Sequence, residues 1–223
     1  MKKLTILLFL IWVFACERDK EIKENIVVEG QIINLNKSKI YLAIVDGGKI
    51  IDSTNVIDGK FTLKAYIDEP KEMSLILNER NSIEKFNFIS EPTNILFKSS
   101  KENFAYNAQL QNSKLFTEYK KIENHINKFD NKDLEMLAKQ IEFSVIGNQQ
   151  KYDSINKERI NLNQKKILFI VNYSINNNNN PLSAFVIYKH KENINKNYIE
   201  KVYKNFSDRV KKSYYGKKLV FKP

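Results

Sequence analysis

Apolar and polar residues alternate along the first half of the chain with the period of a β-strand. Phe61, Leu63 and Ala65 alternate with polar neighbours, as in a strand with one buried face. Hairpin turns are expected at Asp46–Lys49 and at Asp58-Gly59, because glycine tolerates the positive φ of short turns. These criteria predict strands over residues 26–35, 39–45, 49–54, 60–67, 73–77, 85–89 and 94–97. Such short, closely spaced strands predict a small antiparallel β-sandwich or barrel over residues 26–100.

The second half of the chain changes to the period of a helix. Apolar residues from Leu115 to Phe129 are spaced 4, 3, 4 and 3 apart, which predicts one helix face. Asn131 is expected to cap a second helix that ends at Gly147. Further helices are predicted over about residues 150–173, from Asn180-Pro181 onward, and through residue 210 to a stop at Gly216. Strands followed by helices predict an α+β fold, with a helical region over residues 101–219 and a tail over residues 220–223.

The apolar helix stripes have two interpretations. Leu134, Leu137, Ile141 and Val145 repeat at helical spacing. The simpler interpretation is that such stripes pack on one another or on the sheet. The alternative is that they form a coiled-coil or partner-docking face.

The N-terminus has the pattern of a bacterial lipoprotein signal peptide. Lys2 and Lys3 precede the apolar run Leu4–Ala15, and Cys16, the only cysteine of the chain, follows directly. The run is shorter than the roughly 20 apolar residues that a membrane-spanning helix needs. We therefore expect a signal peptide over residues 1–15, lipidation at Cys16 and a polar tether over residues 16–25. An ordinary secretory signal or an uncleaved anchor is the alternative.

These features predict a protein of the cell envelope that is lipid-anchored, at the periplasmic face of the outer membrane or at the cell surface. The formal net charge is +11, but the lysines are spread along the chain rather than clustered. This distribution does not favour nucleic acid as a partner. The expected partners are the membrane, through Cys16, and an envelope protein or polymer.

Sequence motifs for catalysis are weak. His125 and His190 are the only histidines, and their spacing does not predict a zinc site. Asp52-Ser53 is the most motif-like polar pair, and a local hydrogen bond at a strand end is the simpler role. Tyr41 and Tyr66, with Phe61, are candidates for a glycan or peptide surface or for core packing. We predict no catalytic residue, no metal and no cofactor, and hence a protein that is not an enzyme.

Several segments together resemble a known family. Gly48–Ser53 and Gly59–Leu63, followed by Asn180–Val186 and Lys212–Leu219, are similar to the N-terminal domain of unknown function, with its helical extension, of Bacteroidota envelope lipoproteins. Members often continue into a thioredoxin-like domain of the peroxiredoxin type that carries a Cys-x-x-Cys pair. That domain is expected to be absent here, because no cysteine follows Cys16.

The function predicted from the sequence is therefore a membrane-tethered envelope lipoprotein with a non-catalytic binding or scaffolding role. The alternative, which the resemblance implies, is a truncated or split component of a thiol-disulfide interchange system. An enzyme whose site is assembled from loops without a linear signature is a third possibility.

Overall fold

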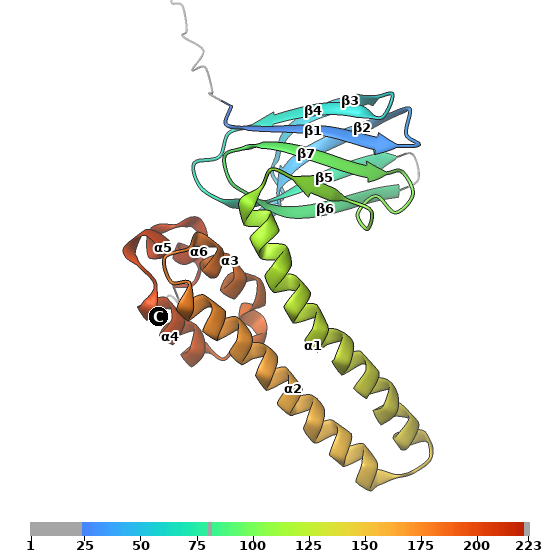
Figure 1. The fold of residues 1–223 in the computed structure, drawn as a ribbon, viewed down its shortest axis with the longest axis vertical. Coiled ribbons are helices and arrows are strands. Elements are labelled where there is room, and N and C mark those ends of the chain that lie inside the picture. Colours follow the sequence, from blue (N-terminus) through green and yellow to red (C-terminus); the bar gives the residue numbers. More distant parts are fainter. Residues whose placement is uncertain (1–23, 80–81, 221–223) are drawn as a thin grey trace, which may run out of the picture.

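The computed structural model describes residues 24–79 and 82–220, and it has the predicted α+β architecture (Figure 1). A curled β-sheet comes first and a helical region follows. The predicted signal peptide, Cys16 and residues 17–23 of the tether lie outside the described residues. Asn25, assigned to the tether above, is instead part of the β domain, because its backbone N–H donates to the carbonyl of Ala65 at 3.0 Å.

One eight-stranded sheet forms the β domain, in the order β6-β5-β2-β3-β4-β1-β7-β8. The strands are β1 (Ile26–Ile33), β2 (Lys37–Ile44), β3 (Ile50–Ile57), β4 (Lys60–Ala65), β5 (Lys71–Glu79), β6 (Ser82–Ser90), β7 (Asn94–Ser100) and β8 (Gln109–Gln111). The sheet curls so that the predicted inward residues of β4, Phe61, Leu63 and Ala65, are buried in one core. The α+β fold and its N-terminal β domain are confirmed.

Two details of the sheet differ from the sequence prediction. The sheet is mixed rather than antiparallel, because β7 runs parallel to β1, with Val28 opposite Ile95. Alternation along a strand fixes its buried face but not the direction of its neighbour. The other difference is β8, which lies beyond residue 100, so the helical region begins at Lys114. A three-residue strand with two glutamines is too short to show a period.

A cluster of phenylalanines fills the curled sheet and reaches its open side. Phe97 contacts Phe61, Phe86 and Phe104, with ring centroids 5.4–6.0 Å apart. Phe116, which comes from the first helix, packs edge-on against Phe86 at 5.8 Å. This contact joins the helical region to the β core.

Six α-helices and one 3₁₀ turn follow in the described chain. They are α1 (Lys114–Val145), α2 (Gln149–Asn176), α3 (Pro181–His190), the 3₁₀ turn (Lys191–Asn193), α4 (Lys196–Asn205), α5 (Asp208–Lys212) and α6 (Tyr214–Lys218). The N-cap at Asn180 with Pro181 at the first position is confirmed. Gly147 lies in the α1–α2 turn with φ +71°, as expected for a helix stop.

The helix boundaries differ from the prediction at two places. Asn131 does not cap a second helix, because α1 continues through it without a break. Propensity at one asparagine is a small term, and the contacts between α1 and α2 keep the helix continuous. The last predicted helix is divided into α4, α5 and α6, because the backbone is extended at Phe206-Ser207 and at Ser213. Gly216 therefore does not end a long helix but lies inside α6, where a Cβ would meet the Val210 carbonyl at 2.0 Å. The glycine is required there by close packing.

Polar contacts fix the helical region against the sheet. The Glu72 backbone N–H donates to the hydroxyl of Tyr215 at 2.8 Å, and the Glu72 carboxylate pairs with Lys189 at 2.7 Å. Asp46, just after β2, accepts hydrogen bonds from Tyr214 and Lys218. Because β5, α3 and α6 meet here, the two cores are held in one arrangement.

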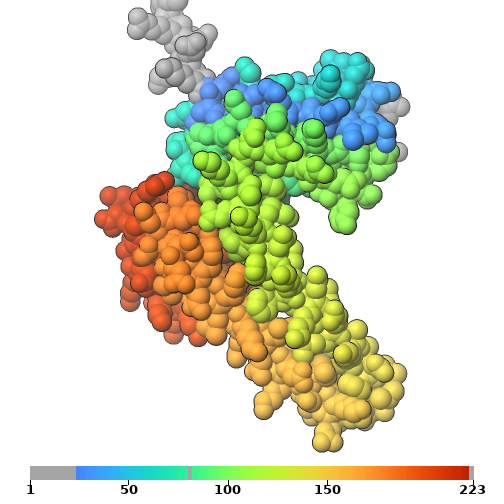
Figure 2. Space-filling model, in the orientation of Figure 1, coloured from blue at the N-terminus to red at the C-terminus, as the bar shows by residue number. Residues whose placement is uncertain are grey.

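The α1–α2 hairpin projects from this body as a long arm. Figure 1 shows its tip at the end of the molecule opposite the start of β1, and Figure 2 shows the distal arm standing clear of the remaining helices. The second core lies at the base of the arm, where α3 to α6 pack against it. No helix in the described ranges is both long and apolar enough to span a membrane.

Candidate binding surface

Ion pairs join α1 and α2 in the middle of the arm. Arg159 binds both carboxylate oxygens of Asp133, at 2.8 and 2.9 Å, and donates to the buried side chain of Gln140 at 2.6 Å. Lys166 pairs with Asp130 at 2.8 Å. The Arg159 guanidinium holds the pKa of Asp133 below its ordinary value, so this carboxylate stays charged. Geometry of this kind fixes the register of the two helices.

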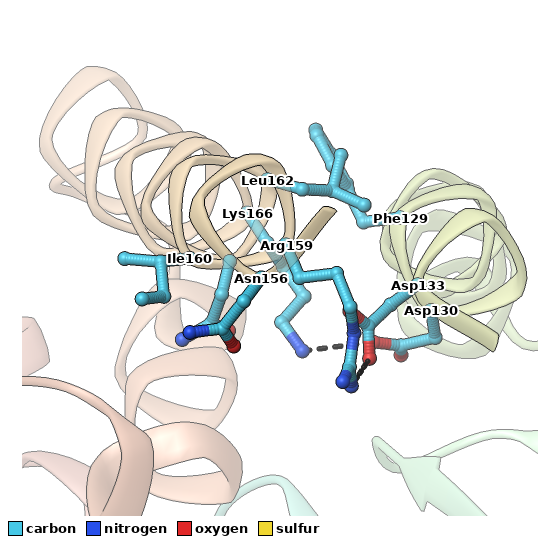
Figure 3. Close-up of a pocket in the computed structure, with 9 residues that line it drawn as sticks. Phe129, Asp130, Asp133, Asn156, Arg159, Ile160, Leu162 and Lys166 are labelled. Carbon is cyan, nitrogen blue, oxygen red and sulfur yellow. Dashed lines mark hydrogen bonds and ion pairs between the residues drawn. The ribbon is translucent and has the colours of Figure 1, made fainter. Parts of the chain in front are cut away.

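A cavity of about 280 Å³ opens beside these pairs (Figure 3). Figure 3 shows Arg159 and Lys166 reaching from α2 toward Asp133 and Asp130 on α1, while Ile160 lies on the other side of α2. The cavity is lined by both charged pairs and by Phe129, Asn156, Ile160, Leu162 and Asn163. Since the charges are paired within the hairpin, the cavity has no large excess of either sign.

An apolar stripe runs from this cavity toward the tip of the arm. Leu134, Ala138, Ile141 and Val145 follow one another at spacings of 4, 3 and 4 on α1, and all four are exposed. Asp130, which lines the cavity, lies one helical turn before Leu134, so the stripe continues the cavity wall. The exposed fractions are 62% for Leu134, 56% for Ile141 and 81% for Val145. We call these four residues, with Ile160 of α2, the distal face.

The proximal half of the same side of the arm is covered by α3. Phe185 of α3 packs edge-on against Tyr119 of α1 at 5.1 Å, and the Ser174 hydroxyl of α2 donates to the Ser183 carbonyl at 3.4 Å. His190 ends α3 close to Lys166. Burial lowers the pKa of His190, and the Lys166 cation lowers it further. One groove between α1 and α2 is therefore filled by α3 at its base and open toward its tip.

The two histidines named above both have structural contacts. His125 stacks on Phe169 with ring centroids 5.6 Å apart, and its Nδ1 lies 2.9 Å from the Lys121 carbonyl oxygen. His190 ends α3. Within the part of the chain that the structure describes, no group of three His, Cys, Asp or Glu residues could hold a metal ion.

The Asp52-Ser53 pair forms the expected local hydrogen bond. The Asp52 carboxylate accepts from the backbone N–H of Ser53 and from that of Lys64, both at 2.7 Å. It thereby links β3 to β4 where the two strands no longer pair. A shallow cavity of about 540 Å³ lies here, lined by Asp52, Lys64 and Tyr66 among others. Of the aromatic candidates, Phe61 is in the core, Tyr41 is partly buried and Tyr66 is 55% exposed.

A third cavity, of about 670 Å³, lies where the asparagine run meets the β domain. Most of the polar side chains that line it make hydrogen bonds within the folded chain. Asn180 caps α3 and donates to Glu118, while Glu91 accepts from the N–H groups of Lys114 and Leu115 at the start of α1. The asparagine run is therefore a structured connection between α2 and α3.

The distal face could be located only in part from the sequence, and the ion pairs could not be. The predicted stripe contained Leu137, which is half-buried, whereas Ala138 takes the exposed position between Leu134 and Ile141. The stripe through Leu134, Ile141 and Val145 has helical spacing, whereas its exposure depends on where α3 ends. Arg159 and Asp133 are 26 residues apart, and no local signal pairs them.

Comparisons with known proteins identify the β domain. No curated protein and no solved structure matches the chain. Residues 26–119 match the family described as a domain of unknown function, DUF4369. The match covers all eight strands and the first turns of α1, and it ends at residue 119, whereas the resemblance noted above extended through Lys212–Leu219. Residues 26–119, less than half of this chain, are therefore similar to the DUF4369 family of domains of unknown function.

Proposed function

We propose that this protein is an envelope lipoprotein, tethered to the membrane through Cys16, that acts as a non-catalytic binding or scaffolding module. The arm is its contact surface. The observation that carries this proposal is the exposed apolar stripe on an arm whose tip is opposite the start of β1 (Figure 1).

Exposed apolar side chains in a row are unfavourable in water unless a partner covers them. Burial of Leu, Ile or Val is worth roughly 1.5–3 kcal/mol each. Contiguous apolar patches on soluble proteins often mark interaction sites. A tether at Cys16 enters the fold at β1, so the arm extends away from the tethered end and can reach another envelope component.

The tether is tested by the Cys16→Ser variant. Without the thiol no lipid can be attached, so the variant is expected to leave the membrane fraction. Arg18→Ser is the matched control, because it changes a neighbouring tether residue and keeps Cys16. Intact mass of the wild-type protein should show cleavage before Cys16 together with acyl groups. Membrane fractionation of Cys16→Ser that equals wild type would reject the tether.

The contact surface is tested separately by placing a photo-crosslinking residue at Ile141 in the full chain. Ile57 on β3 is the control, since it is 65% exposed but lies on the sheet. We expect adducts from position 141 in native membranes and few from position 57. Adducts from position 57 alone would show that the sheet, rather than the arm, is presented to the partner.

A further inference from the structure

The open part of the arm has the size and shape of one half of a four-helix bundle. In such a bundle each helix contacts two neighbours on faces about a quarter-turn apart. On α1, Asp133 and Gln140 face α2, whereas Leu134, Ala138, Ile141 and Val145 form a second stripe beside them. At the base of the arm α3 occupies the corresponding position. Near the tip no part of the described chain does so.

The stripe on α1 has the spacing of a coiled-coil seam. Spacings of 4, 3 and 4 are those of alternating core positions in a heptad repeat, and the seam holds Leu134, Ala138, Ile141 and Val145. In an antiparallel pair of such seams, Leu134 faces Val145 of the other helix and Ala138 faces Ile141. Each contact then pairs a larger side chain with a smaller one, so the stripe is complementary to itself.

We propose that the distal face binds the distal face of a second copy of this chain, so that two arms form an antiparallel four-helix bundle. This inference rests on the proposed function, because it takes the arm as the contact surface and names its partner. The interface is isologous, with α1 of one copy against α1 of the other.

The position of α3 decides the direction of the second arm. Because α3 lies across the groove near Tyr119 and Ser174, a second arm running in the same direction would pass through it. With the tips pointing to opposite ends, each arm covers only the distal face of the other. Both α3 helices then remain in place, and their ends at His190 mark the limits of the overlap.

The area of this contact predicts a weak dimer. From Asp130 to Val145 the face is about 24 Å long at 1.5 Å per residue, and two helices side by side are about 20 Å wide. Two copies therefore bury on the order of 1,000 Å², at the lower limit of specific interfaces.

The test uses cysteine crosslinking of the chain without its signal peptide, residues 16–223 with Cys16→Ser. Cys16 is the only natural cysteine, so introduced thiols can be assigned. Leu134→Cys combined with Val145→Cys should give a covalent dimer under mild oxidation, at least ten times more than either single variant. The single variants cannot crosslink, since equal positions lie about 16 Å apart in the antiparallel pair and a disulfide needs its Cα atoms within about 7 Å.

Lys157→Cys is the control for random collision, because Lys157 is exposed on α2 outside the distal face. A double variant that gives no more dimer than Lys157→Cys would overturn the inference, and so would single variants that crosslink equally well. Sedimentation equilibrium up to about 1 mM protein should show a mass between one and two chains, and Ile141→Asp should return it to one. A monomer at every concentration would also overturn it.

This test is independent of the tether, because the protein used carries no lipid. If crosslinking from Ile141 in membranes captures a different protein or a polymer, the proposed binding function stands and the second-copy inference fails. If Cys16→Ser stays on the membrane while the soluble chain dimerises, the tether fails and the dimer stands.

Discussion

Arg159 is predicted to hold the arm together, and the structure gives the size of its effect. In Arg159→Met the bidentate pair with Asp133 is lost, and Gln140 keeps a buried acceptor without its donor. The ion pair contributes about 0.2–1 kcal/mol, since 23% of the Arg159 side chain and 38% of the Asp133 side chain are exposed. The orphaned Gln140 oxygen costs about 1–3 kcal/mol. We expect the free energy of unfolding to fall by about 2 kcal/mol.

Urea unfolding followed by far-ultraviolet circular dichroism measures this loss. With a slope of about 2 kcal/mol per molar urea, the midpoint should fall by about 1 M. Lys157→Met, an exposed substitution on the same helix, should leave it unchanged. Gln140→Met should recover part of the loss when combined with Arg159→Met, because the buried acceptor is removed. An unchanged midpoint in Arg159→Met, or no recovery in the double variant, would refute this reasoning.

Three further predictions concern stability. Gly30→Ala should lower the free energy of unfolding by about 1–3 kcal/mol, because the added Cβ would lie 2.0 Å from the Phe61 ring. Adding Phe61→Leu to this variant should restore part of the lost stability. Equal urea midpoints for Gly30→Ala and wild type would contradict this prediction. A hydrogen bond from Lys218 lowers the pKa of Asp46, so the charged Asp46 carboxylate stabilises the fold at neutral pH, and this stabilisation is lost as pH falls through the lowered pKa. Asp46→Asn should therefore be less stable than wild type at pH 7. A difference in stability that persists at about pH 2 would count against the Asp46–Lys218 pair as its cause. Burial lowers the pKa of His190, so the unfolded chain binds the proton more tightly, and stability should fall as pH drops below about 6.5. His190→Gln should remove this fall, measured as urea midpoints between about pH 7 and pH 5. A variant with the same pH profile as wild type would exclude His190 as the cause.

The sequence alone determined the local structure of this protein. The alternation at Phe61, Leu63 and Ala65 and the turn at Asp58-Gly59 predicted β4 and its hairpin, because side-chain period and positive φ are properties of neighbouring residues. The cap at Asn180-Pro181 was predicted for the same reason. The β8 strand was missed because it is held by pairing with β7 and not by its own pattern.

Only the tertiary structure decided what those elements contact. The parallel pairing of β1 with β7, the continuous helix through Asn131 and the packing role of Gly216 all depend on residues distant in sequence. The candidate surface depends both on the local sequence pattern and on the tertiary structure. The stripe through Leu134, Ile141 and Val145 is a local pattern, but it is exposed because α3 ends at His190 and leaves the rest of the groove open. Burial is a property of the assembled chain, so the same spacing that predicts a buried helix face forms an exposed surface here.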